Sequence, residues 1–119
     1  SWFEPDKAMP LYKEQERICR ELGSLDGLQS SLYSQAIILQ DQGRLSEAMH
    51  SLKEMEEICR QLGYIEQLCV SMVNQGSIHE DLGNYQDQKA LVEMALDLAT
   101  QNGLSDLALE ITAKLIRIK

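Results

Sequence analysis

The sequence predicts an all-α protein built as a solenoid of antiparallel helix hairpins. The first observation is a repeat with a period of 40 residues, in which Ile18-Cys19-Arg20 returns as Ile58-Cys59-Arg60. The second is that glycines close apolar segments at the same period: Gly23, Gly63 and Gly103 form one series, and Gly43 and Gly83 another. Glycine enters the left-handed conformation that ends many helices without a Cβ penalty. Each period therefore holds two helices and two turns.

The segments between these glycines have the apolar spacing of helices. Apolar residues of segment 45–62 advance by three or four positions, with charged residues between them. The predicted helices, in order, cover residues 6–22, 26–42, 45–62, 66–82, 85–102 and 105–118. Turns of two to four residues join them, and such short turns make neighbouring helices antiparallel. A proline inside a helix costs about 3 kcal/mol, so Pro10 predicts that the first helix starts properly only around Met9.

Stacked hairpins share one core, because a hairpin of this size cannot bury its apolar stripe alone. We therefore expect a single array over residues 1–119, made of a half repeat, two repeats and a terminal helix: 5–23, 24–63, 64–103 and 104–119. The chain opens on what aligns as the second helix of a repeat, which indicates a fragment of a longer array. The terminal helix is a candidate cap, whose C-terminal end is favoured by basic residues, namely Lys114, Arg117 and Lys119.

Composition narrows the function classes. With 44% hydrophobic and 25% charged residues, the chain has the balance of a globular domain. Its formal net charge of -8 makes nucleic acid and membrane surfaces poor partners, and a basic protein or peptide a better one. The longest aliphatic run, 36–39, is far short of the roughly 20 residues of a membrane helix. Three cysteines without a C-x-x-C pair indicate buried thiols and a cytoplasmic location.

The segment around the first glycine turn resembles the tetratricopeptide repeat (TPR) family. That family's pattern places a small residue, a large apolar residue, a glycine, an aromatic or leucine, and an alanine at fixed intervals. The chain has Ala36, Leu39, Gly43, Leu45 and Ala48 at these positions, and then Gly76, His79, Gly83, Tyr85 and Gln88. The 40-residue period is similar to the long repeats of kinesin light chains and Pins-type adaptors. The resemblance implies a right-handed solenoid that serves as a protein-binding scaffold or adaptor, without a cofactor.

No motif in the sequence indicates catalysis. G-x-G-x-x-G, the P-loop, G-x-S-x-G and H-E-x-x-H are all absent, so we expect no enzyme activity. His50 and His79 are 29 residues apart, and we expect no metal site; His50 is interpreted as exposed and His79 as partly buried. Cys19 and Cys59 occupy equivalent repeat positions, which favours a packing role over a reactive one. The charged runs 13–17 and 53–57 are interpreted as a solvated face with helical ion pairs rather than as a recognition strip.

The resemblance implies that the first helix of each hairpin lines a concave groove. The partner-binding candidates carried over on this basis are Tyr33, Ile37, Gln40 and Asp41 in one repeat, and Val73, Asn74, Ser77, Glu80 and Asp81 in the next. These two helices contain no lysine or arginine, so the carboxylate clamp of the chaperone-binding members is not expected. Their acidic end beside an apolar strip predicts a peptide or helix with apolar anchors and a basic residue.

The leading functional hypothesis is therefore a cytoplasmic protein-interaction scaffold. Two other hypotheses stay open at this point. The chain is a regulatory segment of a larger signalling protein, such as an NTPase, or it is an array that associates with itself through incomplete ends.

Overall fold

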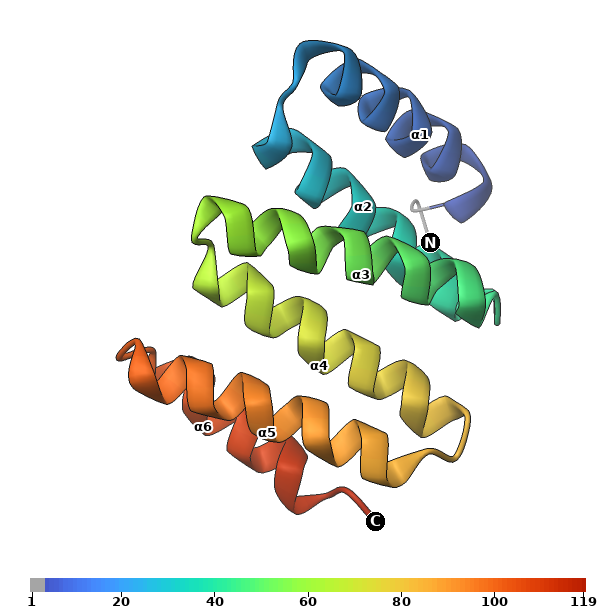
Figure 1. The fold of residues 1–119 in the computed structure, drawn as a ribbon. Helices are drawn as coiled ribbons and strands as arrows, with labels where there is room; N and C mark the ends of the chain where they lie inside the picture. Colours follow the sequence, from blue (N-terminus) through green and yellow to red (C-terminus); the bar gives the residue numbers. More distant parts are fainter. Residues whose placement is uncertain (1–3) are drawn as a thin grey trace. The chain divides into compact units, whose positions relative to one another are not determined.

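The computed structural model describes residues 4–119, and all secondary structure in this range is helical. Figure 1 shows the helices in chain order. They are α1 (Pro5–Leu22), α2 (Leu25–Asp41), α3 (Leu45–Leu62), α4 (Ile65–Asp81), α5 (Tyr85–Gln101) and α6 (Ser105–Ile116). The predicted all-α fold of six consecutive helices is confirmed, and every predicted helix end lies within two residues of the observed one.

The turns between the helices are built on the two predicted series of glycines. Each of these five glycines has a positive φ, between 69° and 79°. The residue after the glycine donates its backbone N–H to a carbonyl of the preceding helix, as Ser24 does to Cys19 (2.9 Å) and Arg44 does to Leu39 (2.9 Å). These bonds satisfy carbonyl groups that a helix end leaves without partners. The glycine period therefore predicts the turn geometry correctly.

The start of the first helix corrects the expectation based on Pro10. Helix α1 begins at Pro5 rather than around Met9, and Pro10 lies inside it. Pro5 occupies the first turn, where its fixed φ is helical and its missing N–H is not needed. The Glu4 carbonyl accepts from the N–H groups of Lys7 (3.0 Å) and Ala8 (2.9 Å), which closes that turn. The carbonyl that Pro10 leaves without its helical donor belongs to exposed Asp6, where water replaces the lost bond.

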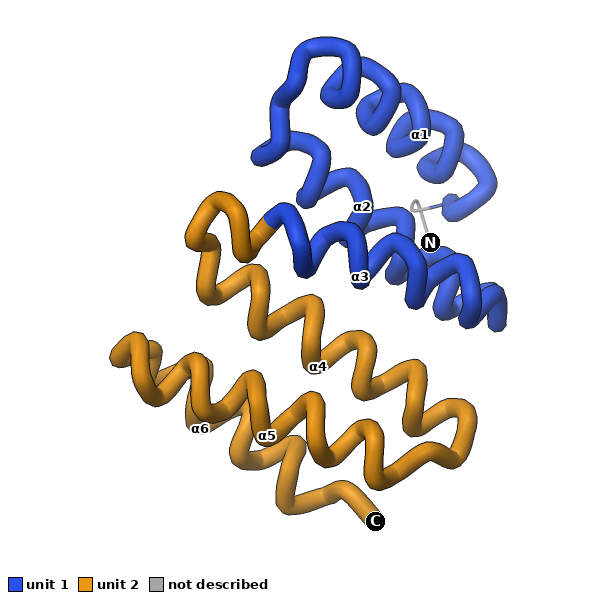
Figure 2. The backbone as a smooth tube through the Cα atoms, in the orientation of Figure 1, with its two compact units in different colours: residues 1–58 blue, residues 59–119 orange. Residues whose placement is uncertain are grey.

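The chain divides into two compact units, Ser1–Ile58 and Cys59–Lys119, with the boundary inside α3 (Figure 2). Helices α1 and α2 pack together in unit 1, and α5 packs on both α4 and α6 in unit 2. Each unit is described by itself below.

In unit 1 a close approach and a polar ladder join α1 to α2. A Cβ on Gly27 would lie 2.6 Å from the Cys19 sulfur, so only glycine fits this position as the helices stand. The Ser31 hydroxyl donates to the Tyr12 carbonyl (2.7 Å), and the Gln35 amide donates to the Glu16 carboxylate (2.9 Å). Ser31 and Gln35 are almost fully buried, yet both are satisfied.

The ladder continues to the surface of unit 1 through an ion-pair network. Arg20 binds Glu16 (2.9 Å) on its own helix and Glu54 (2.9 Å) on α3. Burial acts to raise the pKa of Glu16, but the hydrogen bonds from Gln35 and Arg20 prevail and lower it. Run 13–17 forms the helical ion pairs expected of it, including Arg17 with Glu14.

In unit 2 small residues bring α4 and α5 together. Positions 69, 76, 95 and 99 are small and buried, namely Cys69, Gly76, Ala95 and Ala99. The Cys69 thiol lies 3.4 Å from the Ala95 carbonyl as a weak donor. A Cβ on Gly76 would meet Val92 at 3.4 Å, which is ordinary contact. The approach at Gly76 is therefore looser than the approach at Gly27 in unit 1.

Candidate functional site

The residues with chemical potential are placed as structural groups. Cys19, Cys59 and Cys69 are buried thiols that form no disulfide, and burial raises the pKa of Cys59 to about 11. Burial, followed by the charge of Glu66, also raises the pKa of Cys69. Such thiols are poor nucleophiles at neutral pH.

Histidine and acidic side chains do not gather into a site. His50 is exposed and His79 is half-buried, as expected from the sequence. Among residues 4–119, no group of three or more potential ligands is arranged to hold a metal ion. Within the same range no helix is both long and apolar enough to cross a membrane.

Unit 1 contains a pocket on the predicted face of α2. Its cavity is about 190 Å³ and is lined by three of the predicted residues, Tyr33, Ile37 and Asp41. These follow at intervals of four residues and share one face of the helix. Ser34 and Ile38 of α2, with Tyr12 of α1, complete the lining. Gln40, the fourth predicted residue, is half-buried and lies outside the lining. The pocket is apolar and aromatic with one exposed carboxylate at its end.

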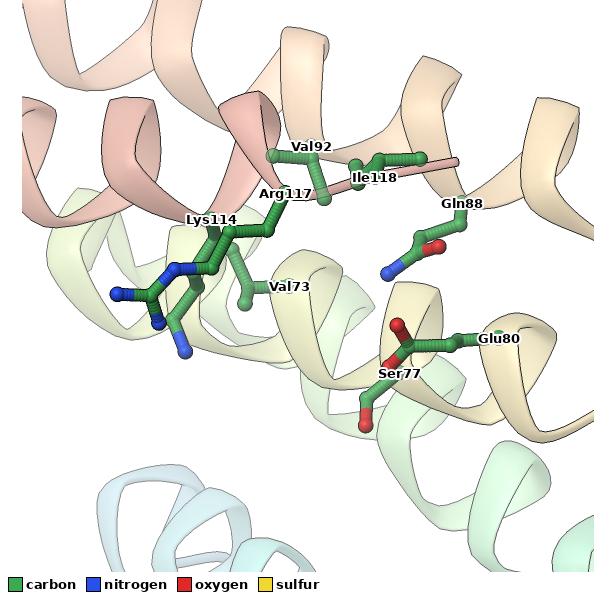
Figure 3. Close-up of a pocket in the computed structure, with 8 residues that line it drawn as sticks. All are labelled: Val73, Ser77, Glu80, Gln88, Val92, Lys114, Arg117 and Ile118. Carbon is green, nitrogen blue, oxygen red and sulfur yellow. The ribbon is translucent and has the colours of Figure 1, made fainter.

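Unit 2 contains a pocket on the corresponding face of α4. Val73, Ser77 and Glu80, three of the five predicted residues, line a cavity of about 200 Å³. The remaining lining residues come from α5, α6 and the segment after α6: Gln88, Val92, Lys114, Arg117 and Ile118 (Figure 3).

Two predicted residues of unit 2 lie outside this pocket. The Asn74 amide donates to the Val70 carbonyl of its own helix at 2.8 Å. Asp81 is exposed at the end of α4.

The two pockets occupy equivalent places in the repeat. Tyr33 and Val73 are 40 residues apart, as are Ile37 and Ser77. The repeat therefore builds a recess at the same helical register in each unit, with different side chains in the two copies. The structure groups Tyr33 with Asp41 in unit 1, and Val73 with Glu80 in unit 2.

Sequence reasoning missed the basic side chains of the unit 2 pocket. It looked for lysine and arginine on the helices that carry the candidate residues, and assigned Lys114 and Arg117 to the helix end of α6. The structure instead places both in the lining opposite α4. The repeat contained the signal, because a shift of 40 carries Asn74 to Lys114 and Ser77 to Arg117. Helix α6 thus repeats the recessed face of α4.

Charge is separated along the unit 2 pocket. Figure 3 shows the amine of Lys114 and the guanidinium of Arg117 at one end, and the carboxylate of Glu80 toward the other. Valines 73 and 92 lie between these ends. All three charged residues are exposed, so their charges are available to a ligand from solvent.

A buried polar group without a partner faces this pocket. Gln88 is only 8% exposed, and its Oε1 atom is buried without a hydrogen bond within the described structure. A buried acceptor left unsatisfied costs about 1–3 kcal/mol. Gln88 stands where the preceding repeat has Ala48, so the polar group is a departure from the packing pattern. Such a group gains a partner when a ligand donates to it.

Comparison of the sequence with protein-family models found no matching family, and comparison with curated proteins found no relative.

Proposed function

We propose that this chain is a cytoplasmic protein-interaction scaffold of the tetratricopeptide type, which binds a segment of a partner protein on the recessed faces of α2 and α4. The observation that carries the proposal is the pair of repeat-equivalent pockets, one in each unit. A recess that returns with the repeat suits an array that reads an elongated ligand along successive helices.

The chemistry of the pocket linings favours a peptide over other ligand classes. Tyr33 and Ile37 in unit 1, and Val73 and Val92 in unit 2, offer apolar contacts for side-chain anchors. Exposed acidic residues at the ends of α2 and α4, namely Asp41, Glu80 and Asp81, favour a basic residue in the partner. The net charge of -8 disfavours nucleic acid and anionic lipid surfaces. Buried thiols of raised pKa support a binding role rather than nucleophilic catalysis.

A displayed library of random peptides tests this function while the natural partner is still unidentified. Peptides are selected on the full chain, and their dissociation constants are then measured for the chain and for a variant carrying Asp41→Lys, Glu80→Lys and Asp81→Lys. We expect a loss of affinity of at least tenfold in the variant, because three attractions become repulsions. A matched variant carries Glu47→Lys, Asp87→Lys and Glu93→Lys, three exposed acids outside both pockets. Selection of no peptide, or equal losses in both variants, contradicts the proposal.

Exposed apolar stripes favour self-association as a second candidate function. Leu11 (71% exposed) and Leu22 (76%) lie on α1, and Leu109 (70%) and Ile116 (78%) lie on α6. Leu109 and Ile116 are the repeat equivalents of Cys69 and Gly76, which α4 buries against α5. The α6 stripe is therefore at the register where a following helix packs, and α1 of a second copy would supply one.

Sedimentation velocity over a hundredfold range of concentration tests the second candidate. We expect the average mass to rise with concentration, and the rise to disappear when Leu109→Lys and Ile116→Lys are combined. A monomer at every concentration contradicts self-association and leaves the peptide-binding proposal standing.

A further inference from the structure

We infer that the unit 2 pocket binds an extended partner segment that carries a basic and an acidic side chain three residues apart, and that Gln88 holds the backbone of that segment. The inference rests on the proposed function, since it specifies what the recessed face of α4 recognises. It also changes the expected partner, because the acidic groups of α4 alone call only for a basic residue.

Charge complementarity sets the two ends of the ligand. Glu80 at one end of the pocket attracts a lysine or arginine, while Lys114 and Arg117 at the other end attract a carboxylate. A purely basic segment would be repelled by the α6 cations, and a purely acidic one by Glu80. Both signs together make every charged contact attractive, and Val73 and Val92 take an apolar side chain between them.

The orphan acceptor of Gln88 sets the backbone conformation. Its buried Oε1 needs an N–H donor from the ligand. The backbone N–H groups inside a helix are already bonded to the carbonyls of the same helix, whereas those of an extended segment are free to donate. An extended segment therefore satisfies Gln88, and a helical ligand does not.

The spacing follows from the geometry of α4. Lys114 lies beside Val73 in the pocket lining, and Glu80 is seven residues farther along the helix. Seven residues of α-helix span about 10 Å at about 1.5 Å per residue. An extended chain covers about 3.3–3.6 Å per residue, so about 10 Å corresponds to three residues. A basic residue at one position and an acidic residue three positions away would reach both ends together.

The carboxylate is assigned to an aspartate or glutamate side chain rather than to a chain terminus. Lys114 and Arg117 are both exposed, and in Figure 3 the guanidinium of Arg117 points outward from the pocket. The segment therefore runs on into solvent beyond them. Peptides with a blocked and a free carboxyl terminus separate the two sources of the carboxylate.

Fluorescence polarisation with synthetic peptides on the full chain tests the inference. The probes are labelled, amidated peptides in which lysine and glutamate flank a valine-leucine pair, in both orders, together with an all-lysine and an all-glutamate peptide. We expect at least one mixed-charge peptide to bind at least tenfold more tightly than either single-charge peptide. Free-carboxyl versions should bind no more tightly than amidated ones.

Variants of the chain assign the binding to the pocket. Gln88→Leu, which keeps the volume and removes the acceptor, should weaken the mixed-charge peptide at least fivefold. Combined Lys114→Glu and Arg117→Glu should reverse the preference, so that the all-lysine peptide binds most tightly. Lys89→Glu and Glu93→Lys, exposed on α5 outside the pocket, should change nothing. Circular dichroism confirms that each variant is folded.

The outcomes separate this inference from the proposed function. Equal binding of mixed and single-charge peptides, or unchanged binding in the Gln88→Leu and charge-reversed variants, overturns the inference. If library-selected peptides still depend on Asp41 while ignoring the unit 2 pocket, the scaffold function stands and the inference fails. If the library yields no peptide and the mixed-charge peptides do not bind, both fail.

Discussion

The same substitution at two helical glycines should change stability in opposite directions. Gly27 lies in the first turn of α2 and Gly76 lies inside α4, and neither has a positive φ. Alanine is favoured over glycine in a helix interior by about 1 kcal/mol. The sign of each substitution is therefore decided by what the added Cβ meets.

At Gly76 the added methyl group has room. Its nearest neighbours would be Val92 at 3.4 Å and Gln88 at 3.5 Å, both ordinary contact distances. We expect Gly76→Ala to raise the free energy of unfolding by about 0.5–1 kcal/mol, mostly through the lower entropy of the unfolded chain.

At Gly27 the methyl group has no room. The Cys19 sulfur would be 2.6 Å away and the Ser24 hydroxyl oxygen 3.2 Å away, and Cys19 is itself buried. Inserting a methylene-sized group into a tight contact typically costs about 1–3 kcal/mol, and the first turn of a helix returns less than the full helical gain. We expect Gly27→Ala to lower the free energy of unfolding by about 1 kcal/mol or more.

Urea denaturation followed by circular dichroism measures both variants, with unchanged slopes showing that the unfolded reference is the same. Adding Cys19→Ala to Gly27→Ala removes the clashing sulfur, so the pair should show a favourable coupling of about 1 kcal/mol in a double-mutant cycle. If Gly27→Ala stabilises the protein as much as Gly76→Ala, or if the coupling is zero, the close approach of α1 and α2 is not as described.

Three further predictions follow from the packing and the charges. Cys59 and Cys69 should resist a thiol-specific aromatic disulfide at pH 8 until denaturant is added, since both are fully buried and burial raises the pKa of each; rapid reaction of both in the native protein would contradict this. Because the pKa of Glu16 is lowered in the folded state, its stabilising effect is present above the ordinary value of 4.5 and is lost as the pH falls through the folded-state value; Glu16→Gln should flatten this acid dependence in thermal melts, and an unchanged slope would refute it. Gln35→Leu should cost about 1–2 kcal/mol in urea denaturation, because the partners of a buried amide lose its hydrogen bonds, whereas the exposed control Gln42→Leu should cost less than about 0.5 kcal/mol.

The sequence predicts the helices and turns of this protein well because both depend on local rules. A glycine at a fixed repeat position specifies a left-handed turn regardless of what packs nearby, so Gly23 and Gly43 locate helix ends almost to the residue. Pro10 misleads for the same reason, since the local penalty of a proline does not reveal that Pro5 and Glu4 have already closed the first turn.

The candidate site is less accessible to sequence reasoning because its residues come from separate helices. Tyr33, Ile37 and Asp41 share one helix face, so spacing alone groups them correctly. The Gln88 amide and the Lys114 amine join Glu80 only through packing of α5 and α6. Extending the repeat register by one more period would have placed Lys114 on the recessed face, but nothing in the sequence shows that Gln88 is left without a partner.

The most direct test of the scaffold account is a map of amide chemical shifts when the isotopically labelled chain binds a library-selected peptide. The account predicts that the largest changes fall on α2 around Tyr33 and Asp41, or on α4 around Val73 and Glu80. Changes confined to the exposed outer residues of α3 and α5, with α2 and α4 unaffected, would contradict it.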